Sequence, residues 1–243
     1  MNLTFPPNPK SVCIIAEISA NHNQDRARAF ALLDAAIDAG ADAIKVQTYT
    51  ADTLTLNSNR PEFRIDQESL WQGRTLYDLY QEAYTPWEWQ REMKEYSEDR
   101  GIPLFSSPFD SSSVKFLESI NVPAYKIASP EIVEKELIQI CAATGKPLVM
   151  STGMSTMEEI EAAVAWARQA GADDITLLKC TSAYPAEPSE MNLNSIPQLA
   201  SKFGLSVGLS DHTLGDTVAI AAVALGARMV EKHFTLHRGD GGP

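Results

Sequence analysis

The stretch AGADAIKVQTY, residues 39–49, leads from the end of an amphipathic helix directly into an apolar strand. Similar joints recur as AGADDI at 170–175 and as LGARMV at 225–230. Each glycine stands where a left-handed residue is needed to end a helix, and an apolar run follows at once. This weak internal repeat predicts a chain that alternates between helices and strands.

Short β-rich runs alternate with segments of helical period along the whole chain. The helical segments include DRARAFALLDAAIDAG and TMEEIEAAVAWARQAG, which are amphipathic. The β-rich runs are almost continuously apolar, which is typical of parallel strands that are covered by helices. We therefore predict eight strands, at residues 13–19, 43–49, 103–109, 124–129, 147–153, 175–181, 206–212 and 229–235.

Eight strands with crossover helices predict a (β/α)8 TIM barrel. The alternative is a doubly wound open sheet, and the absence of a GxGxxG turn after the first strand disfavours it. The long interval 50–100 is predicted to hold a loop, a helix over LWQGRTLYDLYQEAY and a proline-initiated helix in TPWEWQREMKEYSEDRG. No eighth helix follows the last strand before HRGDGGP, so we expect residues 1–243 to be the barrel domain of a longer protein.

The length, hydrophobic content and net charge of the chain limit the classes of protein to which it can belong. A chain of 243 residues that is 44% hydrophobic can bury a substantial core. Its formal net charge of −12 disfavours nucleic-acid binding, which usually needs a basic surface. The sequence has no signal pattern and no apolar run near the ~18 residues of a membrane span. We therefore expect a cytoplasmic protein with no nucleic-acid or membrane partner, in which Cys13, Cys141 and Cys180 are buried, reduced thiols.

The carboxyl ends of the predicted strands are polar, and in such barrels the reactive groups come from these ends and from the loops that follow. Several lysines and hydroxyl groups at one mouth suggest a phosphate or carboxylate ligand, because a buried lysine is costly without an anion. A simple pairing with a neighbouring glutamate explains any single lysine equally well. The strand ends contribute Glu17, Lys45, Gln47, Ser106, Ser107, Lys126, Ser129, Glu131, Ser151, Thr152, Lys179, Ser182, Tyr184, Ser210, His212, Glu231 and His233.

Two histidines occupy matching positions at the ends of the last two predicted strands, His212 in VGLSDHTLG and His233 in EKHF. Adjacent strands lie about 4.8 Å apart, so both imidazoles can reach one ion. Two histidine ligands with open positions suit manganese, iron or zinc more than magnesium. Spacing alone leaves a metal site and a pair of structural histidines both open. His22, in SANHN, is expected only to organise its loop through hydrogen bonds.

Eight motifs occur in order at the strand ends: AEISANHN, KVQTYTADT, FSSPFD, YKIASPE, VMSTGMS, CTSAYPA, GLSDHT and EKHFTL. Together they closely resemble the sialic acid synthase family, which condenses phosphoenolpyruvate with an N-acylated amino sugar to make nine-carbon nonulosonic acids. The resemblance covers about residues 11 to 243. SANHN, YDLYQEAYTPWEWQ, FSSPFD and CTSAYPA are most similar to members that make pseudaminic acid from 2,4-diacetamido-2,4,6-trideoxy-altrose. Synthesis of N-acetylneuraminate or legionaminate is the alternative.

The resemblance implies a role for each matching residue. His212 and His233 match the ligands of a divalent metal, usually Mn²⁺, and Glu17, Lys45 and Lys126 are the expected catalytic residues. Glu17 matches a glutamate beside the reacting end of the sugar. Positions near the acyl-sugar correspond to Glu131 and Tyr184, and Ser182 stands where sialic-acid-making members have Asn, a departure compatible with a different sugar. The positions that hold the phosphate and carboxylate of phosphoenolpyruvate correspond to Lys45, Gln47, Ser107, Lys126, Ser129, Ser151 and Ser210.

The family pattern continues beyond this sequence. It includes an Asp just after the GP that follows strand eight, and a small C-terminal antifreeze-like domain that contributes an arginine to the partner's sugar pocket. The resemblance therefore implies a homodimer for the full-length protein. Two other classes stay open: a Schiff-base aldolase with Lys126 or Lys179 as the nucleophile, and a non-catalytic barrel that binds a sugar acid.

Overall fold

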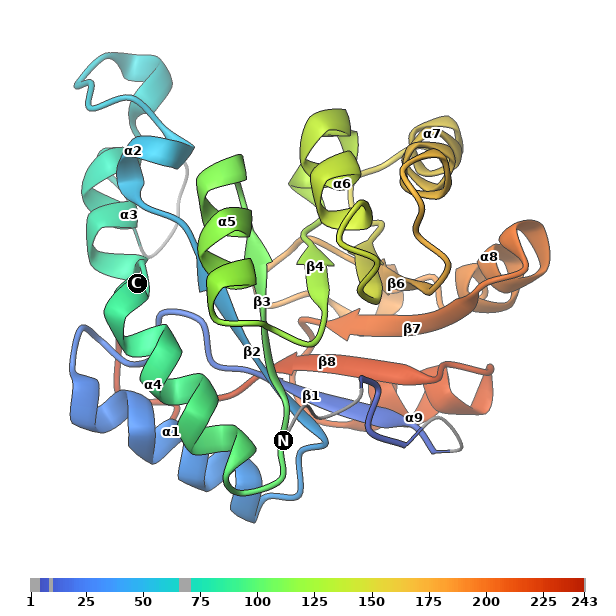
Figure 1. The fold of residues 1–243 in the computed structure, drawn as a ribbon, viewed down its shortest axis with the longest axis horizontal. Helices are drawn as coiled ribbons and strands as arrows, with labels where there is room; N and C mark the ends of the chain where they lie inside the picture. Colours follow the sequence, from blue (N-terminus) through green and yellow to red (C-terminus); the bar gives the residue numbers. More distant parts are fainter. Residues whose placement is uncertain (1–4, 9–10, 66–70, 243) are drawn as a thin grey trace.

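The computed structural model describes residues 5–8, 11–65 and 71–242 of the chain. Eight parallel strands follow one another around a closed barrel, and β8 pairs with β1 (Figure 1). The prediction of a TIM barrel is confirmed, and the open-sheet alternative is wrong. The strands are β1 (Cys13–Glu17), β2 (Ala43–Thr48), β3 (Leu104–Pro108), β4 (Tyr125–Ile127), β5 (Leu148–Ser151), β6 (Ile175–Cys180), β7 (Ser206–Asp211) and β8 (Met229–His233).

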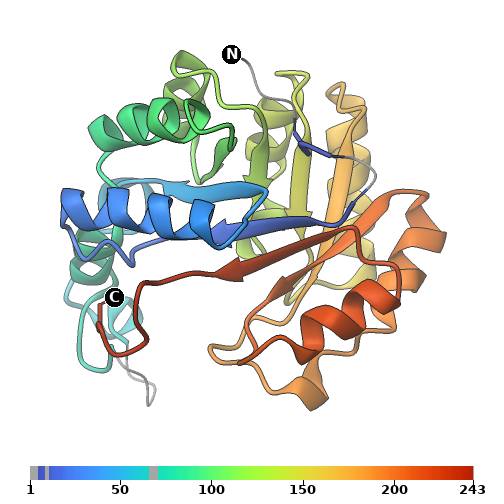
Figure 2. The same cartoon turned by 90° about the horizontal axis from the view of Figure 1, so that it is seen from below.

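Helices cover the outside of the barrel, because each crossover between parallel strands returns the chain over the outer face of the sheet (Figure 2). Among the described residues no helix follows β8. Two 3-10 turns, η2 (Pro130–Val133) and η3 (Pro188–Glu190), follow β4 and β6. The crossover helices are α1 (Arg26–Asp38), α4 (Trp87–Glu98), α5 (Ser111–Ser119), α6 (Lys135–Ala142), α7 (Met157–Gln169), α8 (Ser195–Phe203) and α9 (Thr217–Ala224).

The long interval between β2 and β3 holds α2 (Ala51–Leu54), the 3-10 turn η1 (Pro61–Phe63) and α3 (Leu76–Ala83), and part of it projects from the barrel (Figure 1). The helix predicted over residues 70–84 is too long. Gly73 has φ +82°, a left-handed conformation that interrupts a helix, and the Thr75 hydroxyl caps α3 by accepting from the Asp78 N–H at 3.0 Å. Residue 70 of that prediction lies outside the described residues.

All eight predicted strands extend one or two residues too far at their polar ends. The strand predicted at 13–19 ends at Glu17 in the structure. The strands predicted at 206–212 and 229–235 end at Asp211 and His233. At the first of these ends the chain turns at once, since Ser19 has φ +37° and its N–H bonds back to Glu17 Oε1 at 2.9 Å. The chain after β1 therefore leaves the backbone ladder two residues beyond the last strand residue.

The glycines of the repeated joints have the predicted left-handed conformation. Gly40, Gly171 and Gly226 have φ values of +83°, +100° and +102°. The first joint is closed by two backbone hydrogen bonds, from Gly40 N–H to Ile37 O at 2.9 Å and from Ala41 N–H to Ala36 O at 3.1 Å. Each joint therefore ends its helix and starts the next strand within a few residues.

Apolar side chains fill the barrel and the space between the barrel and its helices. Phe5 lies at the amino-terminal end of the interior, with its ring centroid 4.6 Å from that of Phe105. All three cysteines are buried and form no disulfide, as predicted. The interior layer consists of Phe5, Cys13, Ile15, Ala43, Phe105, Ala124, Val149, Leu178 and Met229.

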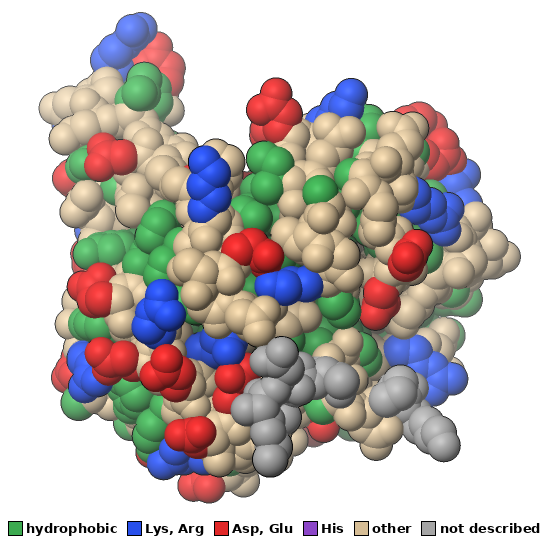
Figure 3. All heavy atoms as spheres, viewed as in Figure 1, with side chains coloured by type: hydrophobic (Ala, Val, Ile, Leu, Met, Phe, Trp, Pro, Cys, Tyr) green, Lys and Arg blue, Asp and Glu red, His purple; other side chains and the backbone are tan. Residues whose placement is uncertain are grey.

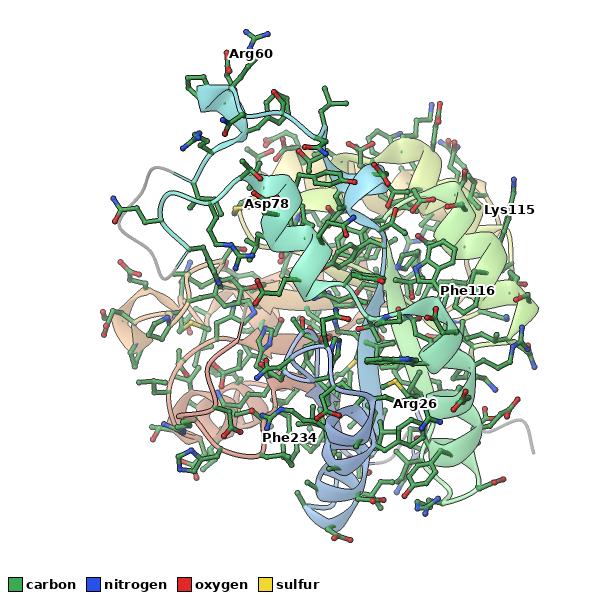
Figure 4. The ribbon with its side chains drawn as sticks, turned by 90° about the vertical axis from the view of Figure 1, so that its left-hand side faces the viewer. Arg26, Arg60, Asp78, Lys115, Phe116 and Phe234 are labelled. Carbon is green, nitrogen blue, oxygen red and sulfur yellow. The ribbon has the colours of Figure 1, made fainter. Side chains whose placement is uncertain are left out.

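The surface shows acidic and basic side chains interspersed. On the face seen in Figure 3, lysines and arginines form no continuous basic area. Arg60 lies at the tip of the projecting segment between β2 and α3, and Asp78 lies on α3 beside it (Figure 4). Over the described ranges, no helix has the length and apolar character needed to cross a membrane.

Candidate active site

The polar residues at the carboxyl ends of the strands continue the inward-facing rows of the apolar interior. Ile15 and Ala43 belong to the interior layer, and Glu17 and Lys45 stand two residues further along the same strands. Successive side chains of a strand point to opposite faces, so Glu17 and Lys45 also face the interior. A layer of buried charge therefore lies directly above the apolar layer.

Lys45 lies at the centre of this charged layer. Its ammonium group forms an ion pair with Glu17 and lies 3.8 Å from Oε1 of Glu231. It also donates to the Ser107 hydroxyl at 3.3 Å, and the Ser210 hydroxyl donates to Glu231 Oε1 at 3.3 Å. All five residues are buried. The contacts join β1, β2, β3, β7 and β8 at one level of the barrel.

Lys126 is the second buried lysine of the layer. Its Nζ donates to the Ser151 hydroxyl at 2.6 Å and to the carbonyl of Ile127 at 3.1 Å. Within the described residues, no carboxylate forms an ion pair with it, although the residue is only 2% exposed. Burial lowers the pKa of Lys126. A buried ammonium group without a carboxylate partner is stabilised by an anionic ligand, so this position is suited to bind one.

The pKa values of the two buried carboxyl groups, Glu17 and Glu231, are shifted in opposite directions. Burial raises the pKa of Glu17, and the nearby Lys45 only partly opposes this effect. Burial also acts on Glu231, but Lys126 and Lys45 outweigh it and lower the pKa of that carboxyl. Glu17 is therefore the carboxyl group that is more easily protonated, which suits a residue that exchanges a proton with a ligand.

Three loops converge at Gly153, which follows β5. Its N–H donates to the Ser129 hydroxyl at 3.1 Å. A methyl group at this position would lie 2.5 Å from Ser182 Oγ and 2.8 Å from Ser129 Oγ, so only glycine allows both hydroxyls to approach. Residue types alone gave no reason to single out Gly153. Its requirement for glycine is steric and depends on chain segments that are distant in sequence.

His212 and His233 lie side by side at the mouth of the barrel, with ring centroids 5.4 Å apart and planes inclined at 47°. Nδ1 of His212 lies 2.8 Å from the carbonyl oxygen of Thr181. Because a carbonyl only accepts, this contact assigns the proton to Nδ1 and leaves the lone pair on Nε2. Tyr184 packs over both imidazoles, with its ring centroid 4.1 Å from His212 and 5.7 Å from His233.

The mouth offers two nitrogen donors to a metal ion. Among the described residues, no cluster of three or more His, Cys, Asp or Glu side chains has the arrangement of a metal site, so further ligands would come from water or substrate. Desolvation, and then the charges of His212 and Lys45, lower the pKa of His233. The imidazole therefore stays neutral and keeps a lone pair available for a metal ion. Nearby, Oε2 of Glu231 is buried and has no hydrogen-bond partner. Two imidazoles with open coordination positions between them fit a divalent transition metal.

Cys180 belongs to the same inner surface, two residues after Leu178 of the apolar layer. Its Sγ lies 4.0 Å from both His212 Nδ1 and Ser182 Oγ. Burial raises the pKa of the thiol, but the hydrogen bond and charge of His212 outweigh it and bring the pKa to about 7. The sequence predicts Cys180 only as a buried, reduced thiol. Strand alternation was the signal that could have placed it in the site.

The remaining predicted residues surround this centre more loosely. Gln47 is partly exposed on β2, and Tyr184 is 64% exposed. Oε2 of Glu131, in η2, is buried without a hydrogen-bond partner, and burial raises the pKa of this residue to about 6. Lys179 lies apart, since its Nζ donates to the Cys180 carbonyl at 2.7 Å and to the Thr181 hydroxyl at 3.0 Å.

His22 has the structural role that the sequence predicts. It is fully buried, and its Nε2 lies 3.1 Å from the Thr85 hydroxyl. Its Nδ1 accepts from the Gln24 N–H at 3.1 Å, and its ring meets the edge of Trp89. These contacts hold the loop after β1 against the segment before α4.

Comparisons with known proteins show the family of the chain. A family model described as the NeuB family matches residues 32–243. A pseudaminic acid synthase from Helicobacter pylori is 48% identical over 225 residues, which cover 93% of this chain and 66% of the relative. A pseudaminic acid synthase from Campylobacter jejuni is 46% identical over 229 residues, which cover 94% of this chain and 66% of the relative. The chain thus spans slightly less than two thirds of the length of both synthases.

A solved structure extends the agreement to the fold. The N-acetylneuraminic acid synthetase from Leptospira borgpetersenii has a TM-score of 0.85 and 33% sequence identity, covering 96% of this chain and 76% of that chain. The resemblance drawn from the strand-end motifs is therefore confirmed at the level of family and fold. The chain belongs to the NeuB family, the sialic acid synthase family, and is similar to its pseudaminic acid synthases.

Proposed function

We propose that the protein condenses phosphoenolpyruvate with an N-acylated amino sugar, giving a nine-carbon nonulosonic acid and inorganic phosphate. The observation that carries the proposal is the pair of buried lysines at the barrel mouth, of which Lys126 has no carboxylate partner among the described residues. Phosphoenolpyruvate carries a phosphate and a carboxylate, the two anionic groups that such a surface stabilises.

The side chains around the lysines supply hydrogen-bond donors for these anionic groups. Ser107 contacts Lys45, and Ser151 contacts Lys126, so each hydroxyl lies beside an ammonium group. In the proposal, Lys45 and Lys126 bind the two anionic groups together with Gln47, Ser107, Ser129, Ser151 and Ser210. Fixed donors in a buried site stabilise charge without a reorganisation cost, and they favour departure of phosphate as an anion.

His212 and His233 are the proposed ligands of a divalent metal, with Mn²⁺ the expected ion. The hydrogen bond from Nδ1 of His212 to Thr181 O would fix the tautomer in which the Nε2 lone pair is available to the ion. When bound, the ion supplies Lewis-acid polarisation of the aldehyde oxygen of the open-chain sugar. Tyr184, which packs over both rings, and Glu131 and Ser182 are the residues proposed to contact the acylated sugar.

The proposed reaction begins when carbon 3 of phosphoenolpyruvate attacks the sugar's aldehyde carbon, which forms the new C–C bond. The π electrons of the aldehyde C=O bond move to its oxygen, which takes up a proton and becomes a hydroxyl group. Positive charge develops at carbon 2, water adds there with loss of a proton, and the C–O bond to phosphate breaks. Glu17 is the proposed general acid/base, because burial raises its pKa and so makes this carboxyl easier to protonate than Glu231.

Pseudaminic acid is the proposed product, from 2,4-diacetamido-2,4,6-trideoxy-altrose. The identities of 48% and 46% to two pseudaminic acid synthases exceed the 33% to the N-acetylneuraminic acid synthetase, which supports this choice. N-acetylneuraminate and legionaminate remain the alternative products. A cytoplasmic location and a homodimer complete the proposal, and light scattering of the purified protein measures the second of these.

The test is a product assay with phosphoenolpyruvate and a panel of acylated amino sugars, with Mn²⁺ or with a chelator. We expect phosphate release only when metal and sugar are both present, and the altrose derivative should give the fastest release. His212→Ala should abolish the metal-dependent turnover. His237→Ala removes an exposed histidine and should behave as the unchanged protein. Phosphate release that occurs without the sugar and at the same rate in the presence of the chelator would contradict the proposal.

A further inference from the structure

Two charged residues immediately precede the paired histidines. Asp211 ends β7 and Lys232 lies in β8, and they are Cα partners in the β7–β8 ladder. Because side chains alternate along a strand, Asp211 and Lys232 point to the outer face of the barrel where His212 and His233 point to its mouth. The charged pair and the histidine pair therefore occupy opposite faces of the same two strands.

The outer pair forms a compact network. Nζ of Lys232 donates to Asp211 Oδ2 at 2.6 Å and to the carbonyl of Thr213 at 2.7 Å. Oδ1 of Asp211 accepts from the N–H of Thr213 at 2.9 Å and from its hydroxyl at 2.7 Å. The Asp211 side chain is fully buried, and the Lys232 side chain is 33% exposed. Lys232 thus forms hydrogen bonds with the residues on both sides of His212, Asp211 and Thr213.

The backbone ladder between β7 and β8 ends just before the two histidines. The β7–β8 ladder pairs Leu209 with Val230, Ser210 with Glu231 and Asp211 with Lys232, and it ends there. His233 pairs instead with Glu17 of β1. At the level of the imidazoles, the direct connection between the two strands passes through the Lys232 side chain.

We propose that the Asp211–Lys232 pair is a positioning device, which holds the imidazoles of His212 and His233 at the separation that one divalent ion requires. This inference rests on the proposed metal site. A ligand pair that is held in place before the metal arrives pays no ordering cost on binding. Groups that orient metal ligands in this way typically change metal affinity by about 10- to 100-fold.

A purely structural role for the pair would affect stability alone, so the test measures two quantities in each variant. One is the Mn²⁺ dissociation constant, from the paramagnetic resonance signal of free Mn²⁺. The other is the unfolding transition in urea. Lys232→Met removes the hydrogen bonds to both neighbours of His212. The matched control is Lys94→Met, which breaks the Lys94–Glu98 pair of α4, whose side chains are 8% and 15% exposed.

We expect Lys232→Met to weaken Mn²⁺ binding by about 10- to 100-fold, and Lys94→Met to leave it unchanged at a similar loss of stability. Lys232→Arg should keep most of the affinity, because a guanidinium group can donate to both Asp211 and the Thr213 carbonyl. If Lys232→Met does not fold, Asp211→Asn replaces it under the same expectation.

Two results overturn the inference in distinguishable ways. Wild-type Mn²⁺ affinity in Lys232→Met, together with loss of binding in His212→Ala, would leave the metal site intact and remove the positioning role. Equal Mn²⁺ binding by His212→Ala and the unchanged protein would remove the metal site itself, and the positioning role with it.

Discussion

The carboxylate of Glu17 and the ammonium group of Lys45 form an ion pair inside the barrel, with side chains only 2% and 4% exposed. The two residues are Cα partners on the adjacent strands β1 and β2. Lys45 also lies 3.8 Å from Glu231, so one cation serves two buried carboxyl groups.

This arrangement predicts unequal effects of removing each partner. Lys45→Met leaves the Glu17 carboxylate without its ion-pair partner and leaves Glu231 with Lys126 as its nearby lysine, so it should cost about 3–5 kcal/mol of unfolding free energy. Glu17→Gln leaves Lys45 with Glu231 and should cost less, about 1–3 kcal/mol. Urea denaturation at neutral pH measures both values. A larger loss in Glu17→Gln than in Lys45→Met would refute the shared-cation interpretation.

Glu17→Gln also tests the proposed acid/base role. Proton transfer by a positioned side chain typically contributes about 10²- to 10⁴-fold, so kcat should fall within that range. The KM for phosphoenolpyruvate should change little, because Glu17 is not proposed to bind its anionic groups. Steady-state kinetics across pH provide the measurement. The proposed role predicts that the pH dependence assigned to Glu17 disappears in the variant, and its persistence would argue for another acid.

The Schiff-base alternative predicts covalent trapping, whereas the proposed condensation does not. Lys126 is the relevant amine, because it is 2% exposed and faces the interior beside Ser151, while Lys179 lies apart from the charged layer. We expect borohydride treatment with pyruvate to add no mass to the protein. A pyruvate adduct that appears in the unchanged protein and is lost in Lys126→Met would favour the aldolase instead.

Gly153→Ala should disturb the site without unfolding the barrel. The added methyl group would displace the hydroxyls of Ser129 and Ser182, and loss of one hydrogen bond costs about 0.5–1.5 kcal/mol. The KM for phosphoenolpyruvate or sugar should therefore rise by roughly 3- to 10-fold. Gly204→Ala is the control, because Gly204 caps α8 with φ +65° and a methyl group there meets nothing within 4 Å. It should lower stability and leave both KM values unchanged.

The lowered pKa of His22 predicts that the unfolding free energy depends on pH between about 4 and 6.5. Burial, and then the charge of Arg28, lower its pKa from 6.5 to about 4, so the folded chain keeps it neutral where the unfolded chain protonates it. Its contribution is complete above pH 6.5 and is lost as the pH falls toward 4, on the order of 3 kcal/mol at 1.36 kcal/mol per unit. His22→Gln should flatten the stability curve over that interval. Parallel curves for the two proteins would exclude the effect.

Much of the fold followed from local patterns. The glycine joints at 40, 171 and 226 and the apolar runs between them predicted eight strands in the right order. Strand alternation also predicted that Lys45 and Gln47 share one face, as do Glu231 and His233. The errors lie at element ends, such as the helix predicted over 70–84, where Gly73 and the Thr75 cap determine the boundary.

The sequence by itself determined which residues stand at the strand ends, because periodicities of two and 3.6 residues are local properties of the chain. Only the closed barrel decided which of them meet. Lys45 and Glu231 are separated by most of the chain, and they approach because both β2 and β8 pair with β1. The membership of Cys180 and Gly153 in the site likewise depends on neighbours from other strands, since contact between distant segments is set by register and closure and not by local residue type.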